Sequence, residues 1–517
     1  MSSTAEYVQP VPQVNPWLIA ITVIMATFME VLDTSVANVS LPHIAGSLSA
    51  SVDESTWVLT SYLVSNAIVL PLTGWLSALF GRKRFFLACV IIFTLSSLLC
   101  GLAPSLPALV ITRVIQGAGG GGMQPTSQAI LVDTFPREKQ GMAMAIYGMG
   151  VVVAPTLGPT LGGWITDNYS WRWIFFLNVP VGILSVVLIS LLISDPVHSA
   201  RRTREQGLKV DFLGLGFLGV GLGLLQIVLD KGERDDWFGS PFIVWTTVIC
   251  VTALIALVVR EWTTDDPVVD LHLFRDRNFA ISTFMMYTLG VVLYGTTLLL
   301  PILLQTLMGY TAMQSGIVLL PGGLVLLAVL PFVGVLLSKF QPRWIVISGL
   351  LIMALGLYQL SHLDLNAGSR TPIYDWIVSR MGTAFLFVPI NVMAFYFVVP
   401  GKMNNASGLI NLARNIGAST GISFVTTMLD RRAQFHQDRL AANLSAGNPT
   451  YQAALHGLTH ILITHGAAAA RAGSEAQALV YRELQRQAMM LSFVDNFRLM
   501  SVICIGVLPL MFVMKKR

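Results

Sequence analysis

The chain has 517 residues, of which 54% are hydrophobic and only 11% are charged, whereas an ordinary soluble domain has about 25% charged residues. A soluble protein of this size could not cover its surface with so few charges. The composition therefore indicates a membrane protein with many spans, and it excludes a soluble enzyme, a nucleic-acid-binding module and a disordered scaffold. The formal net charge of +5 is interpreted as a mark of membrane orientation, because Lys and Arg collect on the cytoplasmic loops of membrane proteins.

The predicted membrane-spanning helices follow one another along the chain as fourteen apolar runs. Residues 1–16 precede them as a polar tail without Lys or Arg, which lacks the features of a signal peptide, so the first run is expected to stay as a helix. Each run provides the roughly 20 residues that a helix needs to cross a bilayer. The runs lie at residues 17–38, 54–76, 85–103, 108–131, 141–165, 173–194, 210–229, 240–260, 279–303, 314–338, 343–362, 372–397, 404–428 and 494–514.

The orientation of these helices follows from the charges of the short loops between them. If both termini lie in the cytoplasm, the cytoplasmic loops and tail hold eighteen Lys and Arg residues, and the short outer loops hold four, namely Arg172, Lys231, Arg234 and Arg370. Positive residues are enriched on the cytoplasmic side of membrane proteins. We therefore expect an even number of spans with both termini in the cytoplasm.

The two halves of the sequence echo one another. Arg113 and Arg380 are separated by 267 residues, and so are Gly150 and Gly417, each of which begins a pattern of small residues four apart. Internal repeats of this kind are typical of transporters and predict two six-helix bundles, with two helices inserted between them. The expected division is a cytoplasmic tail at 1–16, a six-helix bundle at 17–194, a linker with the inserted helices at 195–262, helices nine to thirteen at 263–429, an outward loop at 430–491, and the last helix and cytoplasmic tail at 492–517.

Motifs for metal, nucleotide or enzymatic chemistry are not recognised in the sequence. The four cysteines lie in apolar runs at unrelated spacings, so neither a disulfide framework nor a metal cage is expected. The histidine cluster at His456, His460 and His465 has no acidic or cysteine partner at a fixed spacing. The glycine-rich run at 117–122 follows no strand and lacks a Gly-Lys-Ser/Thr ending, so an ATP-driven pump is not indicated.

Two acidic residues fall within the first apolar run. Glu30 and Asp33 are three residues apart and share one face of a helix. An ionisable side chain at membrane depth is costly to bury and is a functional candidate, here for proton exchange. Arg113 and Arg414 are the cations available to pair with them. The alternative is a buried ion pair that only fixes helix packing.

The fifth apolar run carries Pro155, Gly158, Pro159 and Gly162. Small residues four apart allow close contact between helices, and the prolines bend the helix by removing backbone donors. We expect this smooth, bent helix to lie at the interface between the bundles as a surface that slides or seals. The alternative is a static, tightly packed helix.

Several segments together resemble one family of membrane transporters. They are residues 32–42 with Asp33 and Asn38, residues 109–119 with Arg113, Gln116 and Gly117, residues 158–163, residues 171–180, and Asn411 with Arg414. The pattern resembles the major facilitator superfamily, and within it the fourteen-span drug:proton antiporters typified by the EmrB-like multidrug exporters. The resemblance implies an all-α integral membrane protein with the major facilitator fold, two six-helix bundles plus two inserted helices.

The implied function is proton-coupled export of hydrophobic or amphiphilic drugs across the bacterial inner membrane by alternating access, with no cofactor besides the proton gradient. The alternative of the same fold is an exporter or facilitator for a specific metabolite, fatty acid or siderophore. Asp33, Glu30 and Arg113 are assigned to proton coupling. The residues assigned to the substrate path and gating are Asn38, Gln116, Gly117, Pro155, Gly158, Pro159, Gly162, Asn411 and Arg414.

The expected partners are hydrophobic small molecules, protons and the lipid bilayer, and no nucleic acid. The Ala-, Gln- and Arg-rich stretch at 430–491 is predicted to be helical rather than another span. The resemblance implies that this periplasmic loop docks an adaptor protein leading to an outer-membrane channel.

Two positions depart from the family pattern. Ala78 stands where the loop after the second run usually has an acid, so the usual charge latch on the cytoplasmic side cannot form there and closure is expected to depend more on apolar packing. Glu30 stands where EmrB-like proteins often have an uncharged residue, and a second acid is expected to favour cationic substrates.

Overall fold

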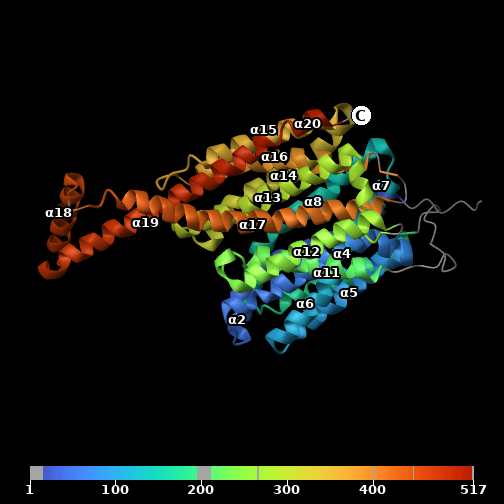
Figure 1. Ribbon diagram of the computed structural model, residues 1–517, viewed down its shortest axis with the longest axis horizontal. Coiled ribbons are helices and arrows are strands. Elements are labelled where there is room, and N and C mark those ends of the chain that lie inside the picture. The colour runs from blue at the N-terminus through green and yellow to red at the C-terminus, as the bar shows by residue number, and fades with distance from the viewer. Residues whose placement is uncertain are drawn as a thin grey trace, which may run out of the picture.

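A computed structural model describes residues 15–194, 211–264, 267–368, 370–396, 398–399, 402–445 and 447–514 of the chain. Most of the predicted N-terminal tail, the start of the predicted linker and the last three residues lie outside this described part. Over these residues the protein consists of helices and connecting turns, without a strand (Figure 1). The all-α class predicted from the sequence is confirmed.

The first bundle contains α1 (Pro16–Val39), α4 (Trp57–Phe80), α5 (Arg82–Leu102), α6 (Leu106–Gly121), α7 (Met123–Thr134), α8 (Arg137–Asn168), α9 (Trp173–Phe176) and α10 (Asn178–Leu192), with the short α2 (Leu41–Ser47) and α3 (Val52–Ser55) between α1 and α4. The inserted pair is α11 (Phe212–Lys231) and α12 (Pro241–Thr263), with the short helices η2 (Trp237–Gly239) and η3 (Leu271–Arg275) before and after α12. The second bundle contains α13 (Arg277–Thr306), α14 (Ala312–Lys339), α15 (Pro342–Leu360), α16 (Arg370–Phe395), α17 (Met403–Ala441), α19 (Ala469–Gly506) and α20 (Leu510–Val513), with α18 (Pro449–Thr464) between α17 and α19.

All fourteen predicted spans fall on helices. Eleven helices of the described residues are long and apolar enough to cross a membrane, and the two halves of α8, which meet at 44°, make a twelfth when taken together. Of the other two predicted spans, one coincides with α6 and α7 together and the other with α17. Arg113 lies on α6 and Arg414 on α17. The total of fourteen spans and the cytoplasmic position of the termini stay predictions.

Local sequence signals set the helix ends. Gly81, at φ +88°, ends α4 and begins α5 in a conformation that a residue with a Cβ rarely adopts. Asp276 caps α13 by accepting a hydrogen bond from the backbone nitrogen of Phe279, at 2.8 Å. Thr311 and Gln314 form a reciprocal capping box at the start of α14.

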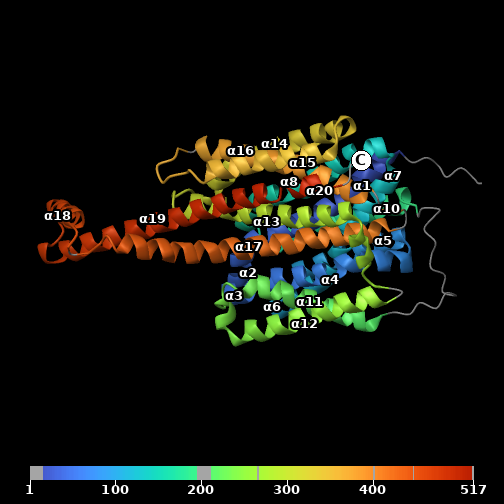
Figure 2. The same cartoon turned by 45° about the horizontal axis from the view of Figure 1, so that its top comes forward.

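The molecule has two distinct ends (Figures 1 and 2). α1 begins and α20 ends at one of them, which we call the terminal end. From the other, which we call the hairpin end, α17 and α19 extend side by side beyond the other helices and carry α18 at their tip. The predicted loop at 430–491 is therefore largely helical, and its predicted boundaries fall inside continuous helices.

The two bundles meet tightly at the terminal end. A Cβ atom at Gly74 of α4 would overlap the side chain of Asn405 of α17, and one at Gly141 of α8 would lie 3.0 Å from the carbonyl oxygen of Gly334 of α14. Glycine at these crossings lets backbones from opposite bundles approach closely. The terminal end is therefore sealed by glycine-mediated contacts.

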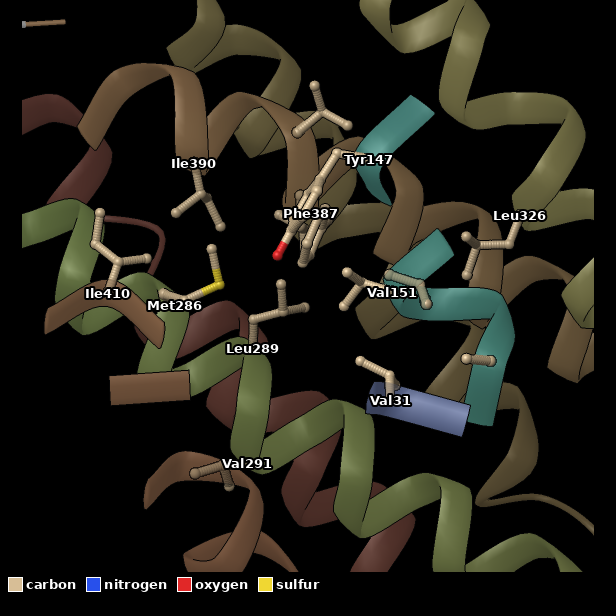
Figure 3. Close-up of a cluster of buried hydrophobic side chains, with 14 of the residues drawn as sticks. Val31, Tyr147, Val151, Met286, Leu289, Val291, Leu326, Phe387, Ile390 and Ile410 are labelled. Carbon is tan, nitrogen blue, oxygen red and sulfur yellow. The ribbon is translucent and has the colours of Figure 1, made fainter. Parts of the chain in front are cut away.

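The same helix pair is looser toward the hairpin end. A Cβ atom at Gly316 of α14 would meet only the side chain of Thr160 of α8, at 3.8 Å. Between the ends, apolar side chains from both bundles form what we call the interbundle apolar cluster (Figure 3). Its labelled members are Val31, Tyr147, Val151, Met286, Leu289, Val291, Leu326, Phe387, Ile390 and Ile410.

The inserted pair contacts both bundles through α11, which packs on α4 and on α17. The hydroxyl of Thr60 in the first bundle donates a hydrogen bond to the Asp230 carboxylate. Gln226 Nε2 donates to Ser419 Oγ of the second bundle, at 2.7 Å. The inserted helices therefore join the bundles along one side.

Candidate functional site

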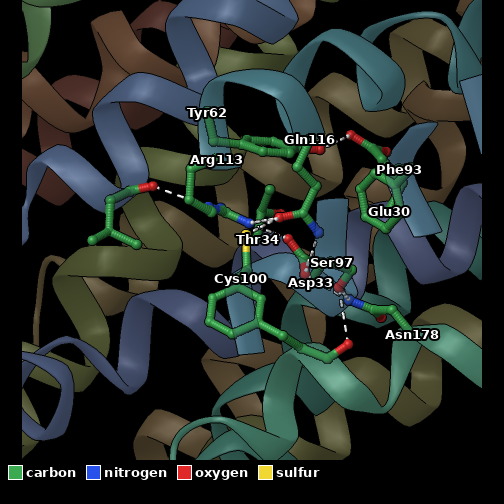
Figure 4. Close-up of polar contacts among 12 residues, drawn as sticks. Glu30, Asp33, Thr34, Tyr62, Phe93, Ser97, Cys100, Arg113, Gln116 and Asn178 are labelled. Atoms are coloured by element: carbon green, nitrogen blue, oxygen red, sulfur yellow. Dashed lines mark hydrogen bonds and ion pairs between the residues drawn. The ribbon is translucent and has the colours of Figure 1, made fainter. Parts of the chain in front are cut away.

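Asp33 lies at the centre of a buried polar network in the first bundle (Figure 4). Its carboxylate oxygen Oδ2 is 2.5 Å from Arg113 Nη1, and its Oδ1 accepts hydrogen bonds from Gln116 Nε2 at 3.0 Å and from Asn178 Nδ2 at 2.6 Å. Asn178 in turn donates to Ser97 Oγ at 3.0 Å. Both members of the ion pair are almost fully buried. Helices α1, α6 and α10 thus meet at one carboxylate, and α5 holds Asn178 through Ser97.

Arg113 is held in place from several sides. Its Nε donates to the carbonyl oxygen of Val58 at 3.0 Å, and its Nη1 donates to Gln116 Oε1 at 2.8 Å. The guanidinium carbon lies 4.3 Å from the centre of the Tyr62 ring, within range of a cation–π interaction. The predicted partner of Asp33 is therefore in contact with it and is restrained independently of it.

Glu30 occupies a separate pocket one helical turn away. One of its oxygens accepts hydrogen bonds from the Tyr62 hydroxyl at 3.0 Å and from Asn66 Nδ2 at 3.3 Å, and the other accepts from Gln124 Nε2 at 2.5 Å. Arg414 of the second bundle donates to Gln124 Oε1. The second predicted cation is thus joined to Glu30 through an amide rather than directly.

Gln124 therefore bridges the bundles. Its amide nitrogen binds an acid of α1 and its amide oxygen binds an arginine of α17. One turn further along α7, Gln128 makes a second bridge, because its Oε1 accepts from Ser407 Oγ at 2.6 Å and from Asn411 Nδ2 at 2.7 Å. Both glutamines are buried.

This arrangement can couple protonation to contact between the bundles. A carboxylate only accepts hydrogen bonds, whereas a protonated carboxyl carries a donor of its own. Protonation of Glu30 would therefore weaken its bond from Gln124, and with it the chain of contacts that ends at Arg414. Protonation of Asp33 would likewise remove the charge that faces Arg113.

Comparison with known proteins places the chain in a family. The family model described as Major Facilitator Superfamily matches residues 23–422. The chain belongs to the major facilitator superfamily. This is a family of membrane transporters rather than enzymes, and its members generally need no cofactor.

Named relatives cover nearly the whole of this superfamily member. It is 39% identical over 457 residues to the multidrug export protein EmrB of Haemophilus influenzae, which covers 88% of this chain and 89% of that protein. It is 35% identical over 503 residues to the multidrug export protein EmrB of Escherichia coli K12, covering 96% and 95%. Together with its apolar helices, these relatives identify it as a multi-pass inner-membrane protein.

A solved structure supports the fold. The proton:xylose symporter XylE has a TM-score of 0.63 with this chain at 15% sequence identity, and the match covers 97% of this chain and 96% of that chain. At this level of identity the likeness concerns the major facilitator fold alone.

The fifth span lies between the bundles as expected, because α8 packs on α14 of the second bundle, but the glycines of its motif do not make this contact. Gly158 and Gly162 do not face the second bundle, because a Cβ atom at either would run into Ser35 or Val36 of α1. The glycines of α8 that meet the second bundle are Gly141 and Gly148, nearer the terminal end. The periodic small residues seal α8 against its own bundle.

The other residues predicted for the substrate path lie in different surroundings. Gly117 lets α6 approach the backbone of α4 at Tyr62. The carbonyl oxygen of Pro155 accepts a hydrogen bond from Ser35 Oγ at 3.2 Å. Asn38 is exposed, and no side-chain contact to the Asp33 network is described for it. The Pro159 side chain lies outside the described part of the structure.

The position of the family's charge latch is occupied by Ala78, which has no charge, and a different ion pair lies nearby. Arg82, at the start of α5, pairs with Asp133 at the end of α7, with 2.6 Å between Nη2 and Oδ2. This ion pair stays within the first bundle. The glycine crossings at the terminal end, in contrast, join the two bundles.

Sequence reasoning missed the amides of the network, namely Asn66, Gln124, Gln128 and Asn178. Each is a buried polar residue within an apolar run. That position is the signal that could have revealed them, since a polar side chain at membrane depth needs a partner.

The helices at the hairpin end are tied together by a small ionic cluster. Arg432 of α17 lies 2.5 Å from the Asp495 carboxylate of α19, and His436 Nε2 lies 2.8 Å from the same oxygen. Ser492 also donates to the carbonyl oxygen of Leu429 at 2.5 Å. α17 and α19 are therefore fastened to each other where they leave the body of the molecule.

Proposed function

We propose that this protein exports hydrophobic or amphiphilic compounds across the bacterial inner membrane in exchange for protons. Alternating access would arise from movement of the bundle at 17–194 against the second bundle, formed by 263–429 and 492–517. The observation that carries the proposal is the pair of buried acids three residues apart on α1. Asp33 is paired with Arg113 of its own bundle, and Glu30 is linked through Gln124 to Arg414 of the other bundle.

The proton gradient can supply the energy that such a cycle needs. One elementary charge moving through 100 mV releases about 2.3 kcal/mol. A tenfold concentration ratio corresponds to about 1.4 kcal/mol, so one coupled charge supports a substrate gradient of roughly forty-fold. Asp33 would carry the proton, and Glu30 would report protonation to the second bundle. The names of the EmrB relatives support drugs as the substrate class.

The test is drug-dependent proton movement in proteoliposomes containing the purified full chain, with tetraphenylphosphonium as a probe of lipophilic-cation export. Asp33→Asn keeps the side-chain volume and removes titration, and it should abolish uptake driven by a pH gradient. Glu261→Gln is the matched control, because this buried acid lies on α12, away from the network. Gradient-driven transport by Asp33→Asn at the parent rate would refute the proposed coupling.

We further propose that the helical hairpin formed by the ends of α17 and α19 with α18 docks a periplasmic adaptor protein. The hairpin extends beyond the other helices (Figure 1), and α18 has no buried residue in this chain alone. A helix that carries apolar residues such as Ile461 and Ile463 on its exposed surface offers a face for a partner. An outer-membrane channel would receive the substrate from that adaptor.

A further inference from the structure

The second bundle holds a buried cation without a carboxylate partner. Arg380 of α16 is only 5% exposed. Its Nη2 donates to Thr296 Oγ1 of α13 at 3.1 Å, and its guanidinium lies 3.6 Å from the centre of the Trp376 ring. Its Nε has no hydrogen-bond partner, as is also the case for Arg113 Nη2 and Arg414 Nε, and among the described residues Arg380 forms no ion pair with an Asp or Glu.

The internal repeat allows the surroundings of Arg380 to be compared with those of Arg113. Arg113 and Arg380 occupy equivalent places in the two bundles, and each contacts the first helix of its own bundle. In the first bundle that helix presents Asp33, whereas in the second it presents the hydroxyl of Thr296. The arginine is thus repeated and its counter-charge is not.

The other charges at this depth are already engaged. Asp33 is paired with Arg113, and Glu30 with Arg414 through Gln124. The nearest acid along α16 is Asp375, which five residues of helix turn by about 140° away from Arg380. Of the three buried arginines Arg113, Arg414 and Arg380, only Arg380 is joined to neither Asp33 nor Glu30, directly or through Gln124, among the described residues. An unpaired charge is expensive to bury, so an anion that reached it would be bound favourably.

Arg380 also has an apolar surface close by. Phe387 of the interbundle apolar cluster (Figure 3) lies seven residues further along α16, which is about two turns on the same face and roughly 10 Å. Leu326 of the cluster is four residues beyond Gly322 of α14, where an added Cβ would touch Trp376 and Arg380. On each of these helices the arginine site is nearer the hairpin end, where the bundles are looser.

We propose that Arg380, with Thr296 and Trp376, binds the anionic group of an amphiphilic substrate whose apolar body lies toward the interbundle apolar cluster. The proposal deepens the proposed function, on which it rests, by naming a substrate class. The guanidinium supplies charged donors for a carboxylate or sulfonate. The indole of Trp376 supplies an aromatic face. Glu30, which sequence reasoning associated with cationic substrates, has its oxygens occupied by Tyr62, Asn66 and Gln124.

The experiment compares two permanently charged probes with one apolar body, pyrene sulfonate and pyrenylmethyl trimethylammonium, in equilibrium binding to the purified full chain. Arg380→Met should weaken binding of the sulfonate about tenfold or more, since a charge-assisted hydrogen bond contributes about 1.5–3 kcal/mol. Binding of the ammonium probe should change less than twofold. Inorganic sulfate at the same concentration should not displace the sulfonate probe, and displacement would overturn the assignment to an amphiphile.

A second variant keeps Arg380 and fills its site from within. Thr296→Asp places a carboxylate beside Arg380, whose Nη2 contacts Thr296 in the parent, so it should form the missing ion pair and weaken sulfonate binding to a similar degree. Thr296→Asn is the matched control of equal size without charge and should retain binding. Parent-like sulfonate affinity in both Arg380→Met and Thr296→Asp would overturn the inference. Only this inference fails if the parent exports pyrenylmethyl trimethylammonium with a pH gradient but neither variant changes sulfonate binding. The proposed function is refuted if the parent exports neither probe when a pH gradient is applied.

Discussion

Replacing Gln124 with methionine should open the terminal end of the molecule. The change nearly preserves volume and removes the amide that binds Glu30 and Arg414. A hydrogen bond to a charged group contributes about 1.5–3 kcal/mol, so the two bonds together set an upper limit of roughly 3–6 kcal/mol. Water that enters the opened site recovers part of this. We expect a net shift of about 2 kcal/mol, or roughly thirty-fold, away from the closed conformation.

The assay is a distance distribution between spin labels on opposite bundles at the terminal end. Phe80 and Phe340 are exposed ends of α4 and α14, and the four native cysteines are buried, so cysteines introduced at these two positions would be labelled selectively. The Gln124→Met protein should show a longer-distance population that is minor in the parent.

Gln128→Met is the matched comparison for this experiment. Gln128 also crosses between the bundles, but its partners Ser407 and Asn411 are neutral. Neutral hydrogen bonds contribute about 0.5–1.5 kcal/mol each, so its effect should be smaller. An unchanged distribution for Gln124→Met, or a larger change for Gln128→Met, would refute the view that the link to the charged pair holds this end closed.

Three other outcomes are expected. Gly158→Val should reduce the amount of folded protein as much as it reduces transport, because the added bulk meets α1 within one bundle; well-folded but inactive protein would contradict this. A hydrogen bond to Asp430 raises the pKa of Glu233 in the loop after α11, so this contact is present when Glu233 is protonated and is lost as pH rises through the raised pKa. Glu233→Gln, which keeps a neutral donor at every pH, should therefore melt at a higher temperature than the parent at pH 8 and at nearly the same temperature at pH 5, and an equal difference at both would exclude the bond. Replacing residues 449–464 with a flexible linker should leave export into isolated inner-membrane vesicles nearly intact and abolish resistance in whole cells, whereas equal loss in vesicles would indicate a lid over the transport path.

The positions of the helices could be predicted because membrane spans need long apolar runs, and each of the fourteen predicted runs lies on a helix. The contact between Asp33 and Arg113 could also be predicted from the sequence, for a related reason. Charges at membrane depth are few, so their candidate partners are few as well. The path from Glu30 to Arg414 was not predictable, since it runs through the amide of Gln124, and nothing in a sequence says which amide faces which charge.

The error about α8 has a different cause. A pattern of glycines four apart predicts that a helix has a close neighbour, but it does not identify that neighbour. Gly158 and Gly162 met α1, while Gly141, outside the recognised motif, met the second bundle. The missing counter-charge of Arg380 depended on the same kind of information, because only the fold shows that Arg380 contacts the hydroxyl of Thr296 and not an acid.

The length of α17 makes it a lever. It runs unbroken for 39 residues, about 58 Å at 1.5 Å per residue, from the glycine crossing beside Asn405 to the hairpin beyond the other helices. Asp495 of α19 pairs with Arg432 and His436 of α17, so the two helices would move together if the second bundle tilted as proposed. A small rotation of the second bundle would displace the far ends of α17 and α19 more than their ends near Asn405, because displacement grows with distance from the axis of rotation. A protein bound to α18 would therefore have its binding site displaced each time the second bundle moved in the transport cycle.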